Sequence, residues 1–132
     1  MKMSEIKTHK KTSERFVGKP QIVEKDKSVV ELETDEEMIV DDKNLIHGGF
    51  IFGLADYAAM LAVNKETVVL GSSESKFLKP VQLGETLKAT AEVKNNENHK
   101  YIVKCIVKNK EKDQKVFEGI FSCQKLKKHV LD

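Results

Sequence analysis

One carboxylate interrupts an otherwise apolar stretch of the sequence. Between Phe50 and Val63 the only charged residue is Asp56. A carboxylate at such a position is costly to desolvate unless it is paired or faces a cavity. Burial would raise its pKa, and the group could then act as a general base or a nucleophile near neutral pH. The alternative is structural: the side chain turns to an exposed edge, or a buried donor satisfies it.

A second candidate group directly precedes this stretch. His47, Gly48 and Gly49 stand where a helix would begin. Paired glycines let a ligand approach the backbone, and the first N–H groups of a helix are unpaired at the positive end of its dipole. Such donors stabilise an oxyanion that develops on a reacting carbonyl. The alternatives are a tight turn for the glycines and a capping or packing role for His47.

The elements that must position these groups can be predicted from the spacing of apolar residues. Phe50 to Val63 contains strong helix formers and no proline, which predicts a helix of about four turns. It is apolar nearly all round, so it must be buried on all sides. It is short for a membrane span and carries Asp56 at its middle, which argues against a membrane protein.

Alternating apolar and polar residues predict strands on both sides of this helix. We expect strands at 21–23, 28–34, 68–78, 83–93, 101–107 and 116–123, with a short apolar run at 38–40. Polar loops at 95–98 and 110–113 predict that the last four strands form an antiparallel meander. The economical assembly is an α+β domain in which one antiparallel sheet wraps a long buried central helix.

Composition indicates one globular domain. The chain has 132 residues, of which 39% are hydrophobic and 33% charged, and its net charge of +2 gives no basic excess for binding nucleic acid. Residues 1–18 lack periodicity and are expected to form an N-terminal arm before a single domain at 19–132. Cys105 and Cys123 lie in apolar patterns with no signal peptide before them, which favours reduced thiols in a cytoplasmic protein.

Residues 44–56 read Asn-Leu-Ile-His-Gly-Gly, four further residues, then Leu-Ala-Asp. This pattern resembles the signature of the hot-dog acyl-CoA thioesterases of the phenylacetyl-CoA thioesterase (PaaI) type. The resemblance continues through Ser75-Lys76-Phe77-Leu78-Lys79-Pro80 and Gly84-Glu85-Thr86-Leu87, and it covers residues 28–123 in all. It implies a hot-dog fold and hydrolysis of an acyl- or aryl-acyl-CoA thioester, with no cofactor or metal beyond the CoA of the substrate.

The resemblance also implies roles for individual residues. Asp56 would be the general base or nucleophile, the N–H of Gly48 the oxyanion donor, and His47 the residue that orients the carbonyl or the local loop. Many relatives have an asparagine six residues before the histidine; that position is Asp41 here, which leaves open whether Asp41 or Asn44 fills the role.

Substrate contacts and assembly follow from the same resemblance. The substrate-binding residues would be Gly49, Ser73, Phe77 and Lys79. Lys76 is a second candidate for the CoA phosphates, Ser72 and Ser75 are further candidates for holding the attacking water, and Phe50, Phe52, Tyr57 and Met60 are candidates for facing the acyl group. Active sites would form between two subunits of a homodimer, which could pair again into a dimer of dimers.

Two other functions fit parts of the pattern. Val69 to Val93 also resembles the effector domain of the malonyl-CoA-responsive repressors of lipid synthesis, so a non-catalytic acyl-CoA-binding module is an alternative. Those repressors carry a DNA-binding helix-turn-helix that an 18-residue arm is too short to supply. A hot-dog hydratase or dehydratase would need a histidine beside its carboxylate, and only His47 could serve; its His-Gly-Gly setting fits the thioesterase pattern better.

Overall fold

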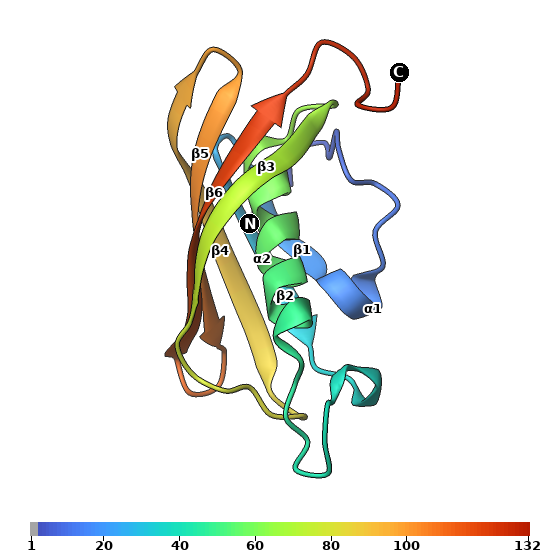
Figure 1. Ribbon diagram of the computed structural model, residues 1–132, viewed down its shortest axis with the longest axis vertical. Coiled ribbons are helices and arrows are strands. Elements are labelled where there is room, and N and C mark those ends of the chain that lie inside the picture. Colours follow the sequence, from blue (N-terminus) through green and yellow to red (C-terminus); the bar gives the residue numbers. More distant parts are fainter. Residues whose placement is uncertain (1–2) are drawn as a thin grey trace.

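The computed structural model describes residues 3–132 and contains one antiparallel sheet that curves around one long helix (Figure 1). The helices are α1 (Glu14–Val17), the 3-10 helix η1 (Glu36–Met38) and α2 (Gly48–Val63). The strands are β1 (Lys19–Glu24), β2 (Lys27–Glu33), β3 (Val68–Phe77), β4 (Thr86–Glu97), β5 (Lys100–Asn109) and β6 (Gln114–Lys125). The predicted hot-dog arrangement, an α+β fold with a central helix, is confirmed.

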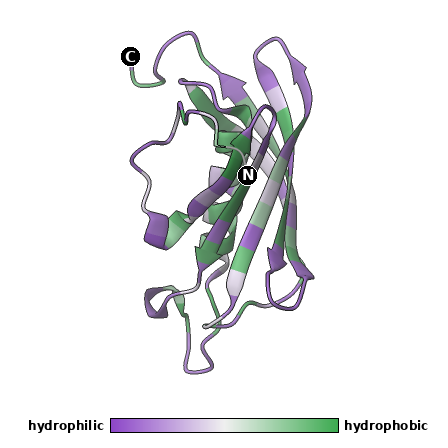
Figure 2. Cartoon of the chain, turned by 180° about the vertical axis from the view of Figure 1, so that it is seen from behind, coloured by the Kyte–Doolittle hydropathy of each residue, from purple (hydrophilic) through white to green (hydrophobic). Residues whose placement is uncertain are grey.

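Helix α2 is the core of the domain. It begins at Gly48 and ends at Val63, close to the predicted limits, and most of its side chains are buried. Figure 2 shows apolar residues along the helix and on the strands that face it. Ser28 on β2 donates a hydrogen bond from Oγ to the carbonyl of Ala58 at 2.6 Å, which ties the middle of the helix to the sheet.

The sheet order is β1-β2-β4-β5-β6-β3. The hairpins β4–β5 and β5–β6 are as predicted, but the prediction that β3 continues the same meander is wrong, because β3 pairs with β6. Alternation of side chains specifies which face of a strand is buried, not which strand lies beside it. The segment 78–85 therefore crosses from β3 at one edge of the sheet to β4 in its interior, between β2 and β5 (Figure 1).

The limits of several strands also differ from the prediction, those of β4 by the most residues. Strand β4 begins at Thr86 rather than at 83, because Gly84 stands in a turn with a φ of 99°. It continues to Glu97, and the hairpin turn lies at Asn98 and His99, whose φ values are 52° and 64°. Positive φ at both central residues is typical of the type I′ turn that matches strand twist.

The two edges of the sheet are not alike. Met3 forms a parallel bridge with Val23, and the N–H of Ser4 donates to the carbonyl of Val23 at 2.8 Å, so the N-terminal segment covers part of the edge at β1. Within residues 3–132 no strand pairs with the outer edge of β3. The side chains of β3 are mostly exposed from Gly71 onward. One long strand edge is therefore open in the isolated chain.

The N-terminal segment packs onto the start of α2. The ring of Phe16 on α1 lies 5.9 Å from that of Phe50, and the guanidinium of Arg15 lies over Phe16. Arg15 also makes a bidentate ion pair with Asp35, at 2.7 and 3.0 Å.

Within residues 3–132 no helix is long and apolar enough to cross a membrane.

At the C-terminal end of α2, Asn64 connects the helix to the N-terminal segment by hydrogen bonds. This residue has a left-handed backbone (φ 50°) and caps the helix. Its side-chain oxygen accepts a hydrogen bond from the N–H of Lys7 at 2.8 Å, and its amide nitrogen donates to the carbonyl of Glu5 at 2.9 Å. A single side chain therefore joins the N-terminal segment to the helix end.

Candidate active site

Asp56 lies in the second half of α2 and is largely buried. Its Oδ1 is inaccessible to solvent and has no hydrogen-bond partner among residues 3–132. Burial raises its pKa from 3.8 to about 6. The alternative that a buried donor satisfies this oxygen is therefore wrong. A carboxylate held without a partner in apolar surroundings, with a pKa close to neutral, is suited to accept a proton.

Cys123 is the neighbour of Asp56 that the sequence did not single out. Burial, and to a lesser degree the charge of Asp56, raises the pKa of the Cys123 thiol to about 12, while burial alone raises the pKa of Cys105 to about 12. Both thiols thus stay protonated and are poor nucleophiles. The alternation of β6 could have indicated this position, because Cys123 lies on the same buried, helix-facing side of the strand as Phe117 and Phe121.

The start of α2 leaves one backbone donor free. His47 precedes the helix, and its Nδ1 accepts a hydrogen bond from the N–H of Gly49 at 2.7 Å. The N–H of Phe50 donates to the carbonyl of His47 at 3.1 Å. The N–H of Gly48 makes no hydrogen bond with any residue that the structure describes. His47 therefore has the capping role, and Gly48 presents an unpaired N–H at the positive end of the helix dipole.

Phe77, at the end of β3, lies directly on Gly48. A β-carbon built on Gly48 would come within 3.2 Å of the Phe77 ring, so glycine is what allows this approach. The ring also packs edge-on against Phe117 at 5.1 Å, and 55% of Phe77 remains exposed. Two residues predicted for the site, 29 positions apart in the sequence, are thus in contact.

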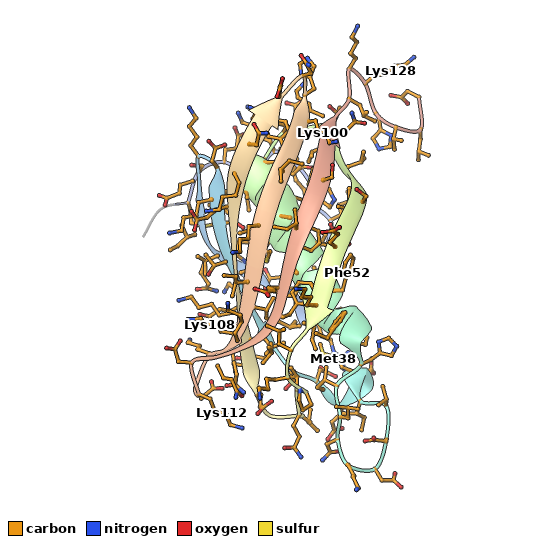
Figure 3. All side chains as sticks on the ribbon, turned by 60° about the vertical axis from the view of Figure 1, so that its left-hand side comes forward. Met38, Phe52, Lys100, Lys108, Lys112 and Lys128 are labelled. Carbon is orange, nitrogen blue, oxygen red and sulfur yellow. The ribbon has the colours of Figure 1, made fainter. Side chains whose placement is uncertain are left out.

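The aromatic residues of α2 divide into two groups. Phe52, which is labelled in Figure 3, meets the rings of Phe117 at 6.5 Å and Phe121 at 5.6 Å on β6. Like Phe50 it keeps part of its surface exposed. Tyr57 and Met60, which were also expected to face the acyl group, are only 7% and 0% exposed because they are enclosed in the core. The aromatic surface beside Asp56 therefore comes from Phe52 and its partners on the sheet.

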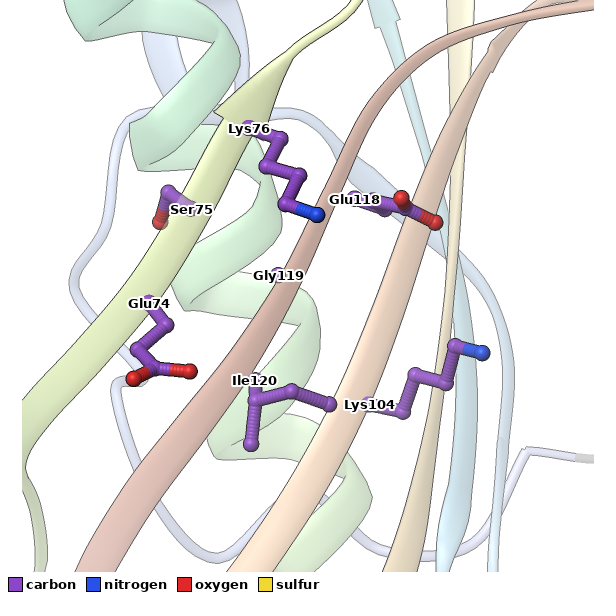
Figure 4. Close-up of a pocket in the computed structure, with 7 residues that line it drawn as sticks. All are labelled: Glu74, Ser75, Lys76, Lys104, Glu118, Gly119 and Ile120. Atoms are coloured by element: carbon purple, nitrogen blue, oxygen red, sulfur yellow. The ribbon is translucent and has the colours of Figure 1, made fainter.

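The pairing of β3 with β6 settles which serines face the helix. Ser73 is opposite Phe121 and Ser75 opposite Gly119, so both share the helix side of the sheet with Phe77. Ser72 is opposite Ser122 and takes the other face. Lys76, opposite Glu118, also lies on the outer face, where Figure 4 shows it extending over β6. Ser73 is therefore on the side of Asp56, whereas Lys76 is wrongly placed to hold a ligand there.

The loop before the helix uses both candidates for the asparagine role. Oδ1 of Asp41 accepts hydrogen bonds from the N–H groups of Lys43 at 3.0 Å and Leu45 at 3.2 Å. Asn44 occupies a left-handed position (φ 64°), and its carbonyl accepts from the N–H of Leu83 at 2.9 Å. Both residues thus shape the loop, and a catalytic role for Asn44 stays a prediction.

Within residues 3–132 no three His, Cys, Asp or Glu side chains gather as metal ligands.

Gly48 and Asp56 are separated along one helix. Eight residues at about 1.5 Å each place them about 12 Å apart along the axis. An oxyanion donor and a general base must each come within about 3 Å of the group on which they act. One copy of α2 therefore cannot bring Gly48 and Asp56 to the same carbonyl.

Sequence comparisons identify relatives of this chain. The model of the thioesterase superfamily matches residues 43–116, which is more than half of the chain and includes Gly48, Asp56 and Phe77. The chain is 44% identical over 117 residues to methylthioribose-1-phosphate isomerase of Aquifex aeolicus, covering 89% of this chain and 25% of the isomerase. It is 34% identical over 89 residues to transcription factor FapR of Thermoanaerobacter, covering 67% of this chain and 44% of FapR. The chain thus spans less than half the length of these relatives.

Solved structures show the same fold. PH1136 of Pyrococcus horikoshii, described as uncharacterized, is 52% identical over the whole of both chains, with a TM-score of 0.96. PaaI of E. coli, from the phenylacetic acid degradation operon, is 24% identical and covers 82% of this chain and 78% of its own, with a TM-score of 0.75. Smu.793 of Streptococcus mutans, solved with acetyl-CoA, is 24% identical over 85% of this chain and 90% of its own, with a TM-score of 0.76. Together with the family model, these likenesses establish that the chain belongs to the thioesterase superfamily, with the hot-dog fold of PaaI.

Proposed function

We propose that the protein hydrolyses an acyl- or aryl-acyl-CoA thioester to the free acid and CoA. The observation that carries this proposal is Asp56, whose Oδ1 is buried without a partner and whose pKa is raised to about 6 by burial. A partnerless carboxylate on the core helix is a standing cost to stability. A role in chemistry explains why a carboxylate is present at this position.

In the proposed reaction Asp56 acts as the general base. It removes a proton from a water molecule whose oxygen attacks the thioester carbonyl carbon, and the carbonyl oxygen becomes an oxyanion that accepts a hydrogen bond from the N–H of Gly48. Collapse of this intermediate breaks the C–S bond, and the proton held by Asp56 passes to the departing thiolate. Direct attack by the carboxylate, through an anhydride that water then opens, is the other form of the same mechanism. Neither form requires a metal or redox cofactor.

The site is completed by a second copy of the chain. Because Gly48 and Asp56 of one copy lie about 12 Å apart along α2, the proposed site combines Asp56 of one subunit with Gly48 of its partner. The open edge of β3 offers backbone hydrogen bonds for joining the two sheets, and exposed Phe77 beside Gly48 offers apolar surface to bury. The expected assembly is a homodimer, or a pair of such dimers.

The names of two relatives bear on the choice of ligand. Smu.793 was solved with acetyl-CoA, which supports a CoA thioester as the ligand of this fold. FapR is named as a transcription factor and not as an enzyme, so its likeness to this chain favours the second candidate function, a binding module without turnover. In that case Asp56 would contact the ligand but not activate water.

A panel of aliphatic and aryl acyl-CoA thioesters tests the proposal. Asp56→Asn and Asp56→Ala should lose at least about a hundredfold in turnover, since each removes the base. Asp26→Asn is the matched control, because it removes an exposed carboxylate from the turn between β1 and β2. Unchanged hydrolysis in both Asp56 variants would overturn the mechanism. Tight binding of the panel by the native protein, with no acid released, would establish the binding module instead.

A further inference from the structure

Contacts between α2 and β6 advance in the same direction along both elements. At the start of the helix the ring of Phe77 lies on Gly48, and Phe77 is paired with Phe117 of β6. One turn later the ring of Phe52 lies 5.6 Å from that of Phe121, which stands further along the strand. A step forward on the helix thus meets a step forward on β6.

The next helix-facing step brings Asp56 of α2 to Cys123 of β6. Asp56 follows Phe52 by one turn, so it lies on the same side of the helix, about 6 Å further along the axis. Cys123 is the next residue after Phe121 on the same face of the strand, about 7 Å further along. Burial, and after it the charge of Asp56, raises the pKa of the Cys123 thiol, whereas burial alone raises that of Cys105. Geometry and charge therefore agree that Cys123 is the neighbour of the carboxylate.

The core around α2 contains few groups that titrate. Asp56 is the only charged residue of the helix, and within residues 3–132 no lysine, arginine, histidine, aspartate or glutamate is buried. Glu14 and Arg15 of α1, which packs on the other side of the helix, are exposed. On β3 the helix-facing side chains do not titrate, and the charged ones take the outer face: Leu70, Ser73, Ser75 and Phe77 inside, Glu74 and Lys76 outside. The buried side chains that titrate are Tyr57, Tyr101, Cys105 and Cys123.

The thiol beside Asp56 makes no hydrogen bond to the buried oxygen of this residue. Oδ1 of Asp56 has no partner among residues 3–132, Cys123 included. A thiol is a weak donor and packs as a small apolar group, whereas a hydroxyl of similar size is a strong donor. A hydrogen bond to a carboxylate favours its charged form and so lowers its affinity for a proton. The sulfur at position 123 therefore bears on how strongly Asp56 holds a proton.

We propose that Cys123 is a positioning residue, which keeps the carboxylate of Asp56 free of a hydrogen-bond donor so that it can hold the proton taken from water. The inference rests on the proposed hydrolysis, in which Asp56 keeps this proton until the thiolate departs. A general base is most effective when its pKa lies near the working pH. Cys123 contributes to this match by leaving the carboxylate unpaired, without contact to the substrate.

The pH dependence of kcat/KM tests this role in four proteins: the native protein, Cys123→Ser, Cys123→Ala and Cys105→Ser. Cys123→Ser should lower the apparent pKa of hydrolysis by about one pH unit from about 6, because its hydroxyl donates to the carboxylate. Cys123→Ala adds no donor and should leave the apparent pKa unchanged. Cys105→Ser is the matched control, because it places the same hydroxyl at a buried position whose thiol does not respond to Asp56.

Three results would overturn the inference. They are an apparent pKa that Cys123→Ser leaves unchanged, an equal decrease in Cys105→Ser, and an equal decrease in Cys123→Ala, since loss of the sulfur and not gain of a donor would then be the cause. Cys123→Thr replaces Cys123→Ser if the latter does not fold, because it supplies the same hydroxyl with a methyl group that fills more of the space and suits a strand.

Urea unfolding measures the same property without turnover. The raised pKa of Asp56 makes the native state bind more protons than the unfolded state between pH 3.8 and about 6, so unfolding becomes easier as the pH rises. In Cys123→Ser this pKa lies closer to its unfolded value. The increase in the unfolding equilibrium constant from about pH 4 to about pH 8 should therefore be about tenfold smaller than in the native protein. Cys105→Ser should keep the full increase.

The two measurements distinguish failure of the inference from failure of the proposed function. If no thioester is hydrolysed but Cys123→Ser reduces the pH dependence of unfolding, the effect of Cys123 on Asp56 is supported and the proposed hydrolysis is refuted. If thioesters are hydrolysed but all four proteins unfold with the same pH dependence, the role of Cys123 is refuted and the hydrolysis stands.

Discussion

Replacing Asp56 by asparagine should stabilise the protein while it abolishes turnover. The substitution keeps the shape of the side chain and removes its charge. In the native protein the charged carboxylate has a buried oxygen without a hydrogen-bond partner. An amide of the same size is less costly to bury than a carboxylate. The stability and the activity of this position are therefore expected to change in opposite directions.

The magnitude follows from the pKa of Asp56, which is raised by burial from 3.8 to about 6. Between these two values the native state binds more protons than the unfolded state, so the free energy of unfolding falls as the pH rises. The full difference corresponds to about 3 kcal/mol. Below pH 3.8 the carboxyl is neutral in both states, and above about pH 6 the native state carries the whole cost of its charge.

Urea unfolding of the native protein and of Asp56→Asn measures this effect. Both proteins are followed from about pH 4 to about pH 8 at one fixed protein concentration, because the stability of a dimer depends on concentration. The stability of the variant relative to the native protein should increase by about 2.5 kcal/mol across this range, because part of the full difference has already developed at pH 4, just above the unfolded-state pKa of 3.8. Over the same range hydrolysis by the native protein should rise with an apparent pKa of about 6, as Asp56 loses its proton.

The control is again Asp26→Asn, since Asp26 is exposed in a turn. A difference between Asp56→Asn and the native protein that stays constant with pH would refute the reasoning. So would a native protein that gains stability over the variant as the pH rises, because that is the behaviour of a carboxylate that folding stabilises.

Two further substitutions test features of α2. Gly48→Pro should lower kcat by about 10²- to 10³-fold in steady-state kinetics, because it removes the free N–H at a helix position that accepts proline. The control is Gly48→Ala, which keeps this N–H and displaces the exposed Phe77 ring. Equal losses of kcat in the two variants would contradict the oxyanion role. Asn64→Ala should reduce the free energy of unfolding by about 2 kcal/mol, because it loses two hydrogen bonds and places alanine in a left-handed conformation. Asn64→Gly also lacks the two hydrogen bonds but adopts the left-handed conformation without strain, so in urea unfolding it should be more stable than Asn64→Ala and less stable than the native protein. A glycine variant no more stable than the alanine variant would show that backbone strain contributes nothing to the loss.

The helix and its two unusual features were predictable because their signals are local. All-round apolar composition predicted burial of a helix over 50–63, and the helix begins only two residues earlier, with the capping residue His47 and the left-handed Asn64 just outside its limits. The exception at Asp56 could be found in the same way, since one charged residue in an apolar helix is visible without any knowledge of its neighbours. The lack of a hydrogen-bond partner for the N–H of Gly48 followed from the place of this residue at the helix start.

The arrangement around the helix was not predictable because it depends on pairing between distant segments. Leu70 faces the helix, and simple alternation would place Ser72 on the same side. A bulge at Gly71 reverses the parity, so that Ser73 faces inward and Ser72 outward. The contact of Phe77 with Gly48 and the closeness of Cys123 to Asp56 likewise depend on β3 lying beside β6, which no periodicity records.

The charges on the edge strand β3 have a consequence for how two copies can meet. If two β3 edges pair antiparallel about Ser75, with both helices on one face of the joined sheet, Glu74 of each copy lies opposite Lys76 of the other. Moving the centre of pairing by one residue sets Glu74 against Glu74, or Lys76 against Lys76. Opposite charges directly across a strand pair are stabilising and like charges are destabilising. Two side chains on the outer face would thus select one alignment of the dimer and, through it, the distance between Asp56 and the partner's helix start.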